Sequence, residues 1–264
     1  MYVDPIGLEK IVVSGGSDGN ETFRYNFIET AILQIKKWQE KNPDETITWI
    51  VAEWNYSDED LKNFKEVAES YEVNFITISN KDELFDHINC EGRSEDLISE
   101  MAFFAHGTGF DAGGVANPGY SGQYAIALGY SAVDGVGHNN DLNIFISDLN
   151  NISNSSFTSD CYTFFGSCRT GNMFNGKTFA QEWVNITGGL SVAARGFFNG
   201  RTTYINIFPD ERSFATKVIN KLGVFGYTEA EREIAREKYG FSSAGSKNFP
   251  QTASWSRWAE FRPR

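Results

Sequence analysis

Residues 10–52 decide the fold: KIVVSGG (10–16), ETFRYNFIETAILQIKKWQE (21–40) and TITWIVA (46–52) follow one another along the chain. The first and third pieces are short apolar runs, which are typical of buried β-strands. The middle piece has apolar residues at helical spacing, and Asn42-Pro43 stops the helix that this spacing predicts. The apolar residues concerned are Phe27, Ile28, Ala31, Ile32, Ile35 and Trp38. A strand, a helix and a second strand in this order indicate a β-α-β unit with parallel strands.

The same alternation continues along the chain. Ser57 and Asp60 have the spacing of a helix capping box, with Asp in place of the usual Glu, and an apolar stripe from Leu61 to Tyr71 follows them. Further strands are predicted over residues 74–79, 101–105, 161–166 and 190–194, with 203–208 as another candidate, and further helices over 81–88, 178–184, 213–222 and 229–239. Residues 123–131 are a candidate strand, 143–148 are ambiguous between strand and helix, and 150–160 form a polar loop. We therefore expect an α/β fold, a three-layer sandwich whose mostly parallel central sheet has helices on both faces.

Composition and charge limit the classes of function. The chain of 264 residues is 41% hydrophobic and 22% charged, as expected for a globular protein of one large domain or two small ones. Its net charge of -12 argues against a nucleic-acid binder that relies on a broad basic face. Residues 201–264 carry 11 Lys and Arg against 7 Asp and Glu, so a nucleic-acid partner is disfavoured but not excluded.

The sequence contains no apolar window of about 18 residues, so no transmembrane helix is expected. Its first ten residues, MYVDPIGLEK, lack the basic and apolar regions of a signal peptide. The three cysteines, Cys90, Cys161 and Cys168, are an odd number without framework spacing. We therefore expect reduced thiols and a cytosolic working site.

Two predicted strands end in a reactive side chain that glycine follows closely. The first is FFAHGTG (103–109), which contains His106 and Gly107, and the second is FFGSCRTG (164–171), which contains Cys168. Ligand sites in parallel α/β sheets lie beyond the carboxyl ends of the strands. If the two strands are parallel neighbours, His106 and Cys168 lie at the same edge of the sheet.

That pairing is what nucleophilic thiol chemistry needs. A thiolate is the attacking species, and a nearby imidazole can take the thiol proton or stabilise the thiolate as an ion pair. The N–H groups of Gly107 and Cys168 could form an oxyanion hole, and a helix that begins after Cys168 could further favour the thiolate. Cys90 and Cys161 are expected to be structural, and His87 and His138 are expected to carry no chemistry.

Two other motifs compete with this interpretation. GGSDG (15–19) satisfies the G-x-S-x-G pattern of serine-hydrolase nucleophile elbows, but it follows the first strand, whereas such elbows normally follow several. A glycine-rich turn at the start of a helix is the better interpretation. The same stretch lacks the Lys-Ser/Thr of a P-loop, and no Cys/His spacing suggests zinc.

The pair AHGTG and GSCRTG resembles the caspase-like (clan CD) cysteine peptidases, a group that includes caspases, legumains, gingipains and self-processing domains of bacterial toxins. His106, Gly107 and Cys168 match the pattern of that clan, and the resemblance covers about residues 10–208. It implies a caspase-like sandwich, a Cys-His dyad and no cofactor. Residues 209–264 lie beyond the resemblance, and the helices predicted within them indicate a helical C-terminal extension. Several members have an acidic residue two positions before the nucleophile that selects basic P1 side chains. Here that position is Gly166, so such selectivity is not expected.

A second resemblance lies at the start of the chain. YVDPIGL (2–8) is similar to the YVDPxGL signature that closes the core of Rhs-repeat polymorphic toxins. It implies that residues 1–8 are a remnant of the Rhs shell and that 9–264 are an excised toxin domain. The implied partners are the parent Rhs shell, a cognate immunity protein and a target protein. Delivery by a secretion system, such as type VI, would bring the domain to the recipient-cell cytoplasm.

The resulting expectation is a cysteine endopeptidase toxin in which Cys168 attacks and His106 handles the proton. Two alternatives stay open: a Cys-His deamidase or acyltransferase that acts on proteins, and a non-catalytic module that binds its target. Caspase-like domains often mature by a cut between the His and Cys segments. Self-cleavage within the polar loop 150–160 is therefore a further hypothesis.

Overall fold

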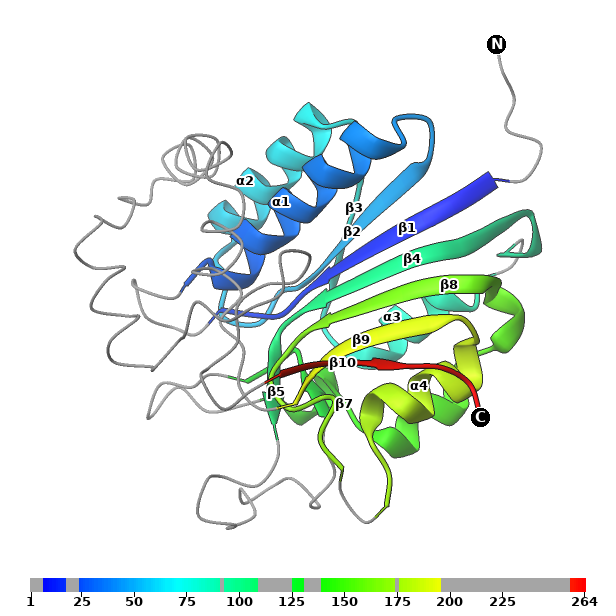
Figure 1. The fold of residues 1–264 in the computed structure, drawn as a ribbon. Helices are drawn as coiled ribbons and strands as arrows, with labels where there is room; N and C mark the ends of the chain where they lie inside the picture. The colour runs from blue at the N-terminus through cyan, green and yellow to red at the C-terminus, as the bar shows by residue number, and fades with distance from the viewer. Residues whose placement is uncertain are drawn as a thin grey trace.

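The computed structural model describes residues 7–17, 24–90, 93–108, 125–130, 139–173, 176–195 and 257–264. These residues form an α/β three-layer sandwich around one large, mostly parallel sheet (Figure 1). The predicted fold class is therefore confirmed. No helix in the described ranges is both long and apolar enough to cross a membrane.

The large sheet has seven strands. A smaller sheet of three strands begins just beyond the carboxyl end of its middle strand. The seven strands are β1 (Gly7–Ser14), β2 (Thr46–Ala52), β3 (Asn74–Ile78), β4 (Asp96–Phe104), β8 (Phe157–Gly166), β9 (Leu190–Arg195) and β10 (Arg257–Phe261). The smaller, antiparallel sheet consists of β5 (His106–Thr108), β6 (Ala125–Ala127) and β7 (Asn143–Ile144). The α-helices are α1 (Asn26–Lys41), α2 (Asp58–Ser70), α3 (Lys81–Ile88) and α4 (Phe179–Thr187). Short 3-10 helices span Arg93–Glu95, Asn140–Leu142, Ile146–Asn151 and Asn154–Ser156.

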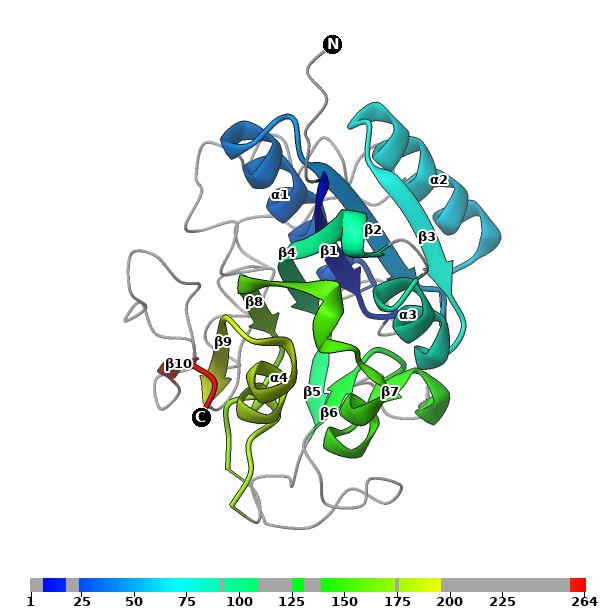
Figure 2. The same ribbon diagram turned by 90° about the vertical axis from the view of Figure 1, so that its right-hand side faces the viewer.

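The strand order in the large sheet is β10-β9-β8-β4-β1-β2-β3, in which β10 alone runs antiparallel to its neighbour. Helices α1 and α2 pack on one face and α3 and α4 on the other (Figures 1 and 2). Along β1, Ile11 and Val13 join the core of α3 and α4, whereas Val12 joins the core of α1 and α2. A central parallel strand is covered on both faces, which explains the continuous apolar runs in the sequence.

The predicted capping box at the start of α2 is present. The Ser57 side chain accepts a hydrogen bond from the backbone N–H of Asp60, and the Asp60 carboxylate accepts one from the backbone N–H of Ser57. The same carboxylate pairs with Arg24 and accepts a hydrogen bond from the Tyr25 hydroxyl at 2.5 Å. Burial by itself raises the pKa of Asp60, but the hydrogen bonds from Tyr25, Ser57 and Arg24 outweigh it and lower the pKa. The cap thus also joins the start of α1 to the start of α2.

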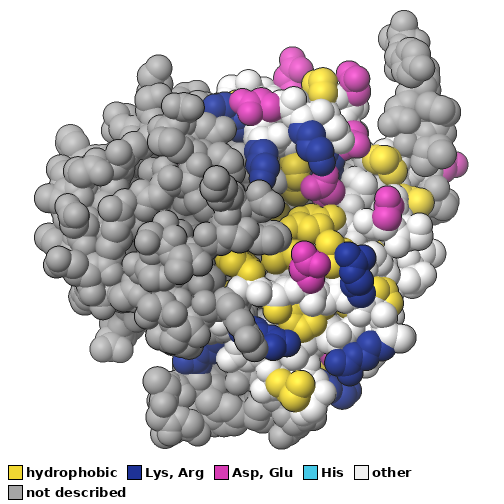
Figure 3. Space-filling model, in the orientation of Figure 1, with side chains coloured by type: hydrophobic (Ala, Val, Ile, Leu, Met, Phe, Trp, Pro, Cys, Tyr) yellow, Lys and Arg dark blue, Asp and Glu magenta, His cyan; other side chains and the backbone are white. Residues whose placement is uncertain are grey.

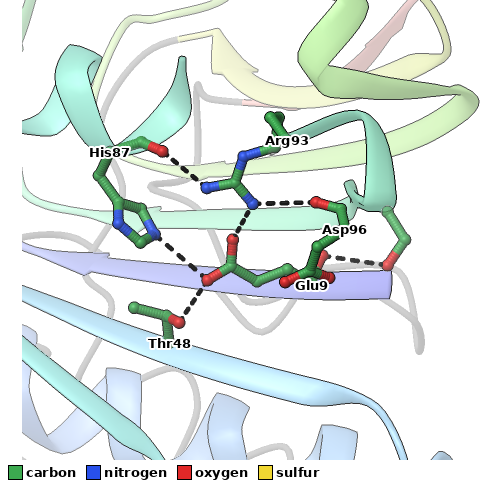
Figure 4. Close-up of polar contacts among 6 residues, drawn as sticks. Glu9, Thr48, His87, Arg93 and Asp96 are labelled. Carbon is green, nitrogen blue, oxygen red and sulfur yellow. Dashed lines mark hydrogen bonds and ion pairs between the residues drawn. The ribbon is translucent and has the colours of Figure 1, made fainter. Parts of the chain in front are cut away.

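A buried carboxylate fixes the N-terminal part of β1. Glu9 is 3% exposed and forms an ion pair with Arg93, and it accepts a hydrogen bond from Thr48 of β2 (Figure 4). His87 Nε2 lies 3.2 Å from the same carboxylate, and Arg93 also donates to the backbone oxygens of His87 (2.6 Å) and Asp96 (3.0 Å). Burial by itself raises the pKa of Glu9, but the hydrogen bonds from His87 and Thr48 and the charge of Arg93 lower it below its ordinary value.

Lys10, the next residue of β1, is a second buried charged residue, and its side chain lies on the opposite face of the sheet from that of Glu9. Lys10 is 1% exposed, and its Nζ lies 2.6 Å from Glu45 and 3.1 Å from Glu100. The Trp38 indole N–H donates to Glu100 at 2.8 Å, and Lys10 Nζ lies 5.7 Å from the centre of the Trp38 ring. Both faces of β1 therefore carry paired charges near its N-terminal end.

The prediction for the C-terminal end of the chain is wrong in part. Residues 257–261 were expected to belong to a helical extension, but they form β10, which pairs with β9. Pairing with a strand distant in sequence leaves no local pattern that could have shown it. Gly7 and Leu8, assigned to the shell remnant, belong to β1 and pair with Asp96 and Leu97. The segments predicted over 203–208, 213–222 and 229–239 lie outside the described residues.

Residues 150–160 do not form one polar loop. Two 3-10 helices, Ile146–Asn151 and Asn154–Ser156, extend into this range, and β8 begins at Phe157. The side chains of Ile152 and Phe157 are buried in the core. Asn89 joins this segment to the end of α3, since its side chain donates to the Asn151 carbonyl at 2.7 Å and accepts from the Ser153 N–H at 2.9 Å. Asn154 donates to the Ile186 carbonyl at 2.6 Å. Residues 153–155 remain exposed, so self-cleavage stays a prediction for that short stretch.

We predict that Glu9→Gln lowers the free energy of unfolding by about 3 kcal/mol at pH 7, because it leaves the charge of the buried Arg93 without its partner. The pKa of Glu9 is lowered in the folded state, so its stabilising contribution is present above the ordinary value of 4.5 and is lost as pH falls through the folded-state pKa. Urea unfolding at pH 7 and pH 3 measures this. The gap between wild type and variant should shrink at pH 3.

Glu40→Gln is the matched control, because Glu40 is 61% exposed and its ion pair with Lys36 is long, at 3.8 Å. It should change stability by a few tenths of a kcal/mol. Equal effects of the two substitutions at pH 7 would show that the Glu9 network does not hold the fold together.

Candidate active site

Strand pairing brings the two predicted strand ends together. β4 and β8 are parallel neighbours, and Phe104 at the end of β4 pairs with Gly166 at the end of β8. His106 and Cys168 each follow two residues after this last pair, so they occupy equivalent positions at the carboxyl edge of the sheet. Cys168 packs against the core of α1 and α2, and His106 contacts Phe27, which packs against the same core. Both side chains therefore lie on the α1 side of the sheet.

The backbones at the two positions are in close contact. A Cβ atom at Gly107 would overlap the Cys168 peptide group, lying 2.6 Å from its carbonyl carbon and 2.7 Å from its nitrogen. Such distances are far below van der Waals contact, so only glycine fits after His106. The contact also brings the peptide groups of Gly107 and Cys168 next to each other. The oxyanion hole expected from their N–H groups stays a prediction.

His106 is the first residue of β5, and its backbone pairs with Ala127 of β6. The small sheet therefore fixes the backbone of His106, while its side chain is partly exposed. Its imidazole contacts two aromatic rings, those of Phe27 and Tyr130. These two aromatic residues were not singled out from the sequence, because neither is near His106 along the chain.

A strained turn presents Cys168. Arg169 is 8% exposed and has a φ of 61°. This left-handed conformation is costly for any residue that has a Cβ atom. The Arg169 carbonyl accepts from the Asn172 N–H at 2.8 Å, and the Gly171 N–H donates to the Ala194 carbonyl of β9 at 3.0 Å. Cys168 itself is partly exposed. The turn is thus held by β9, and no sequence signal predicts Arg in this conformation.

The structure does not support one part of the prediction for the thiol. The helix expected to favour the thiolate is α4, which begins at Phe179 with Thr178 as its N-cap. Phe179 and the rest of the buried face of α4 belong to the core on the other side of the sheet from Cys168. The field of a helix terminus falls off within about one turn, so we assign α4 no role in activating Cys168.

The glycine two positions before Cys168 has a packing cause. A Cβ atom at Gly166 would lie 2.5 Å from Cδ1 of Phe104 and 2.9 Å from the Phe103 carbonyl oxygen. The ring of Phe104, which is fully buried, thus occupies the space that an acidic side chain would need. This agrees with the expectation that Gly166 supplies no selectivity for basic P1 residues.

The other cysteines and histidines have different surroundings. Cys161 is buried in β8, and burial raises the pKa of its thiol to about 12, whereas Cys90 is exposed just after α3. The structural role expected for Cys90 therefore has no packing to support it. His87 belongs to the Glu9 network, which gives it a structural contact and does not contradict the expectation that it carries no chemistry. His138 lies outside the described residues.

The glycine-rich stretch after β1 does not have the form of a nucleophile elbow. Ser17 is 1% exposed, and its backbone N–H donates to the Trp54 carbonyl at 3.0 Å. A Cβ atom at Gly16 would lie 2.5 Å from the same carbonyl oxygen, so close packing of two loops explains this glycine. A buried Ser17 could not act as a nucleophile. Among the described residues, no three His, Cys, Asp or Glu side chains form a cluster that could hold a metal ion.

We predict that iodoacetamide modifies Cys168 at least ten times faster than Cys161 near neutral pH. Cys168 is partly exposed beside His106, whereas Cys161 is buried and its thiol has a pKa of about 12. Peptide mass spectrometry over a time course measures both rates, and the exposed Cys90 serves as the reference for an accessible thiol. Labelling of Cys168 that is slower than that of Cys90 at pH 7 would contradict an activated thiol.

Comparisons of the chain with models of known protein families, with curated proteins and with solved structures find no match.

Proposed function

We propose that the chain is a cysteine endopeptidase effector domain that cleaves a target protein through a dyad of Cys168 and His106. The observation that carries this proposal is the contact between Gly107 and the Cys168 backbone at the ends of the adjacent parallel strands β4 and β8. It supports the proposal because the residues that carry the imidazole and the partly exposed thiol follow equivalent positions at the ends of the two strands. The resemblance of AHGTG and GSCRTG to caspase-like peptidases supports the same assignment.

The proposed reaction needs no group beyond this chain and water. Sγ of Cys168 attacks the peptide carbonyl carbon, and His106 takes the thiol proton. The N–H groups of Gly107 and Cys168 stabilise the oxyanion. As the C–N bond breaks, His106 gives its proton to the leaving amine, and an acyl-enzyme remains. Water then attacks the thioester with His106 as base, which releases the carboxylic acid and restores the thiol.

The charge distribution supports a protein target over a nucleic acid. On the described surface in Figure 3, Lys and Arg side chains are interspersed with Asp and Glu, without a broad basic patch in that view. Phosphate recognition depends on clustered positive charge, and a net charge of -12 disfavours it.

The N-terminal motif supports the role as a toxin. If the Rhs shell is cut after Leu8, the cut falls within β1, just before the buried Glu9. The ion pair of Glu9 with Arg93 and the central apolar part of β1 would stay in place after such a cut. We therefore propose that the domain is released from an Rhs shell, is delivered by a secretion system such as type VI, and acts in the recipient cytoplasm. A cognate immunity protein is its proposed partner in the producing cell.

We predict that Cys168→Ala and His106→Ala each abolish toxicity in recipient cells while leaving the melting temperature within about 2 °C of wild type. The double variant should match either single variant, because the two groups act as a unit. A survey of new protein N-termini in intoxicated cells identifies the cleaved target. Cys161→Ala removes a thiol from β8, the strand that ends just before Cys168, and should remain toxic if it folds.

The masses of the target separate the alternatives. A peptidase yields two fragments, a deamidase shifts the mass by about 1 Da, and an acyltransferase adds a group to the target. Full toxicity of correctly folded Cys168→Ala would refute catalysis by this dyad and favour a module that acts by binding.

We further predict that the cleavage sites show no general requirement for Arg or Lys at P1, because the Phe104 ring fills the space at Gly166 where an acidic selector would lie. The mapped N-termini from the same survey test this directly. Cleavage almost always after Arg or Lys would show that another carboxylate supplies the selectivity.

A further inference from the structure

We propose that Phe27 and Tyr130 are positioning residues that hold the His106 imidazole in the orientation needed to serve Cys168. This inference deepens the proposed function and rests on it. It concerns residues from two segments distant in sequence, the first turn of α1 and the turn after β6, which meet at His106.

Two aromatic rings make edge-to-face contacts with the imidazole. The centre of the Phe27 ring lies 5.0 Å from that of His106, with 89° between the ring planes. The centre of the Tyr130 ring lies 5.4 Å away, with 82° between the planes. Both are edge-to-face arrangements at the separations that aromatic pairs prefer, and each contributes about 0.5–1.5 kcal/mol beyond simple burial.

Phe27 is anchored to the core beneath it. The Ser14 hydroxyl at the end of β1 donates to the Phe27 carbonyl at 3.3 Å and accepts from the Trp49 indole N–H at 2.9 Å. Ser14 and Trp49 are fully buried in the central strands β1 and β2. The second residue of α1 is therefore fixed to the rigid part of the sheet, and its ring reaches His106 from there.

Tyr130 is held from the other side. It follows Leu128 and Gly129, a turn that is bonded to two other segments. The Leu128 carbonyl accepts from the Gly16 N–H at 2.7 Å, and the Gly129 N–H donates to the Asn143 side chain at 3.2 Å. The turn is thus joined to the loop after β1 and to β7, so both rings are carried by anchored backbone.

A partly exposed histidine without such contacts can change rotamer on the nanosecond timescale. The contacts with Phe27 and Tyr130 favour the rotamer of His106 in which both contacts are made. The orientation of a proton-transferring group determines how often it lies within hydrogen-bond reach of its partner. Loss of either ring should therefore lower the fraction of time that His106 spends beside the thiol, without removing any reacting group.

The test measures the rate at which iodoacetamide alkylates Cys168 from pH 5 to pH 9. Iodoacetamide is small and carries no peptide, so it reports on the thiol and not on substrate contacts. We expect Phe27→Leu and Tyr130→Leu each to slow alkylation by about three- to ten-fold on the plateau below pH 8. Phe27→Tyr and Tyr130→Phe keep a ring and should restore rates to within about two-fold of wild type.

Phe157→Leu is the matched control. Phe157 on β8 belongs to the core of α3 and α4, on the other face of the sheet, and makes an edge-to-face contact with Trp183 at 6.2 Å. It carries the same substitution as Phe27→Leu but lies away from His106. It should leave the alkylation profile unchanged even if it lowers the melting temperature by a similar amount.

A double-variant cycle shows whether the rings act through His106. Adding Phe27→Leu to His106→Ala should produce no further slowing. An equal slowing in the presence and absence of His106 would overturn the positioning role, as would a normal profile for both Leu variants. If His106→Ala itself leaves alkylation of Cys168 unchanged, the dyad of the proposed function fails, and the positioning role fails with it.

Discussion

The parallel pairing of β4 with β8 is the constraint on which the candidate site depends. The pairing ends at Phe104 and Gly166, and both chains then continue side by side for two more residues, to His106 and Cys168. Two glycines permit this. Gly166 leaves room for the Phe104 ring across the strand pair, and Gly107 lets the backbone after His106 lie against the Cys168 peptide group. A Cβ atom at either position would separate the strand ends that carry the reactive side chains.

The central strand β1 has paired buried charges near its beginning and runs toward the edge of the sheet that carries the candidate site. Near its beginning, Glu9 and Lys10 point to opposite faces, and each is paired with partners from other elements. Buried ion pairs contribute little net stability compared with apolar packing, but each charge tolerates only the register that supplies its partner. A slip of one residue would place Glu9 on the face of Glu45 and Glu100 and take it away from Arg93. The pairing of β1 with β4 shifts by one residue between Glu9 and Lys10, and from Lys10 with Glu100 it runs in one register to Ser14 with Phe104.

The loops at the carboxyl edge of the sheet, around the candidate site, are joined by backbone hydrogen bonds. The loop after β1 bonds to the loop after β2 through Ser17 and Trp54, and to the turn after β6 through Gly16 and Leu128. The turn after β8 is bonded to β9 through Gly171. Loops commonly carry function because they are free to vary, but reacting groups also need fixed geometry. Here backbone hydrogen bonds between loops supply that geometry.

The sequence alone determined the α/β class, since β-α-β alternation is visible in the periodicity of residues 10–52 and recurs through residue 194. It also singled out His106, Gly107 and Cys168 as candidate site residues, because hydrophobic strands that end in a His or Cys close to glycine form local patterns. Strand order is not local: the sequence did not show that β4 lies between β1 and β8, nor that residues 257–261 complete the sheet beside β9. The same limit applies to the rings of Phe27 and Tyr130 around His106, the left-handed Arg169, and His87 beside Glu9. Each of these depends on contacts between segments far apart in the chain, and periodicity and composition carry no information on such contacts.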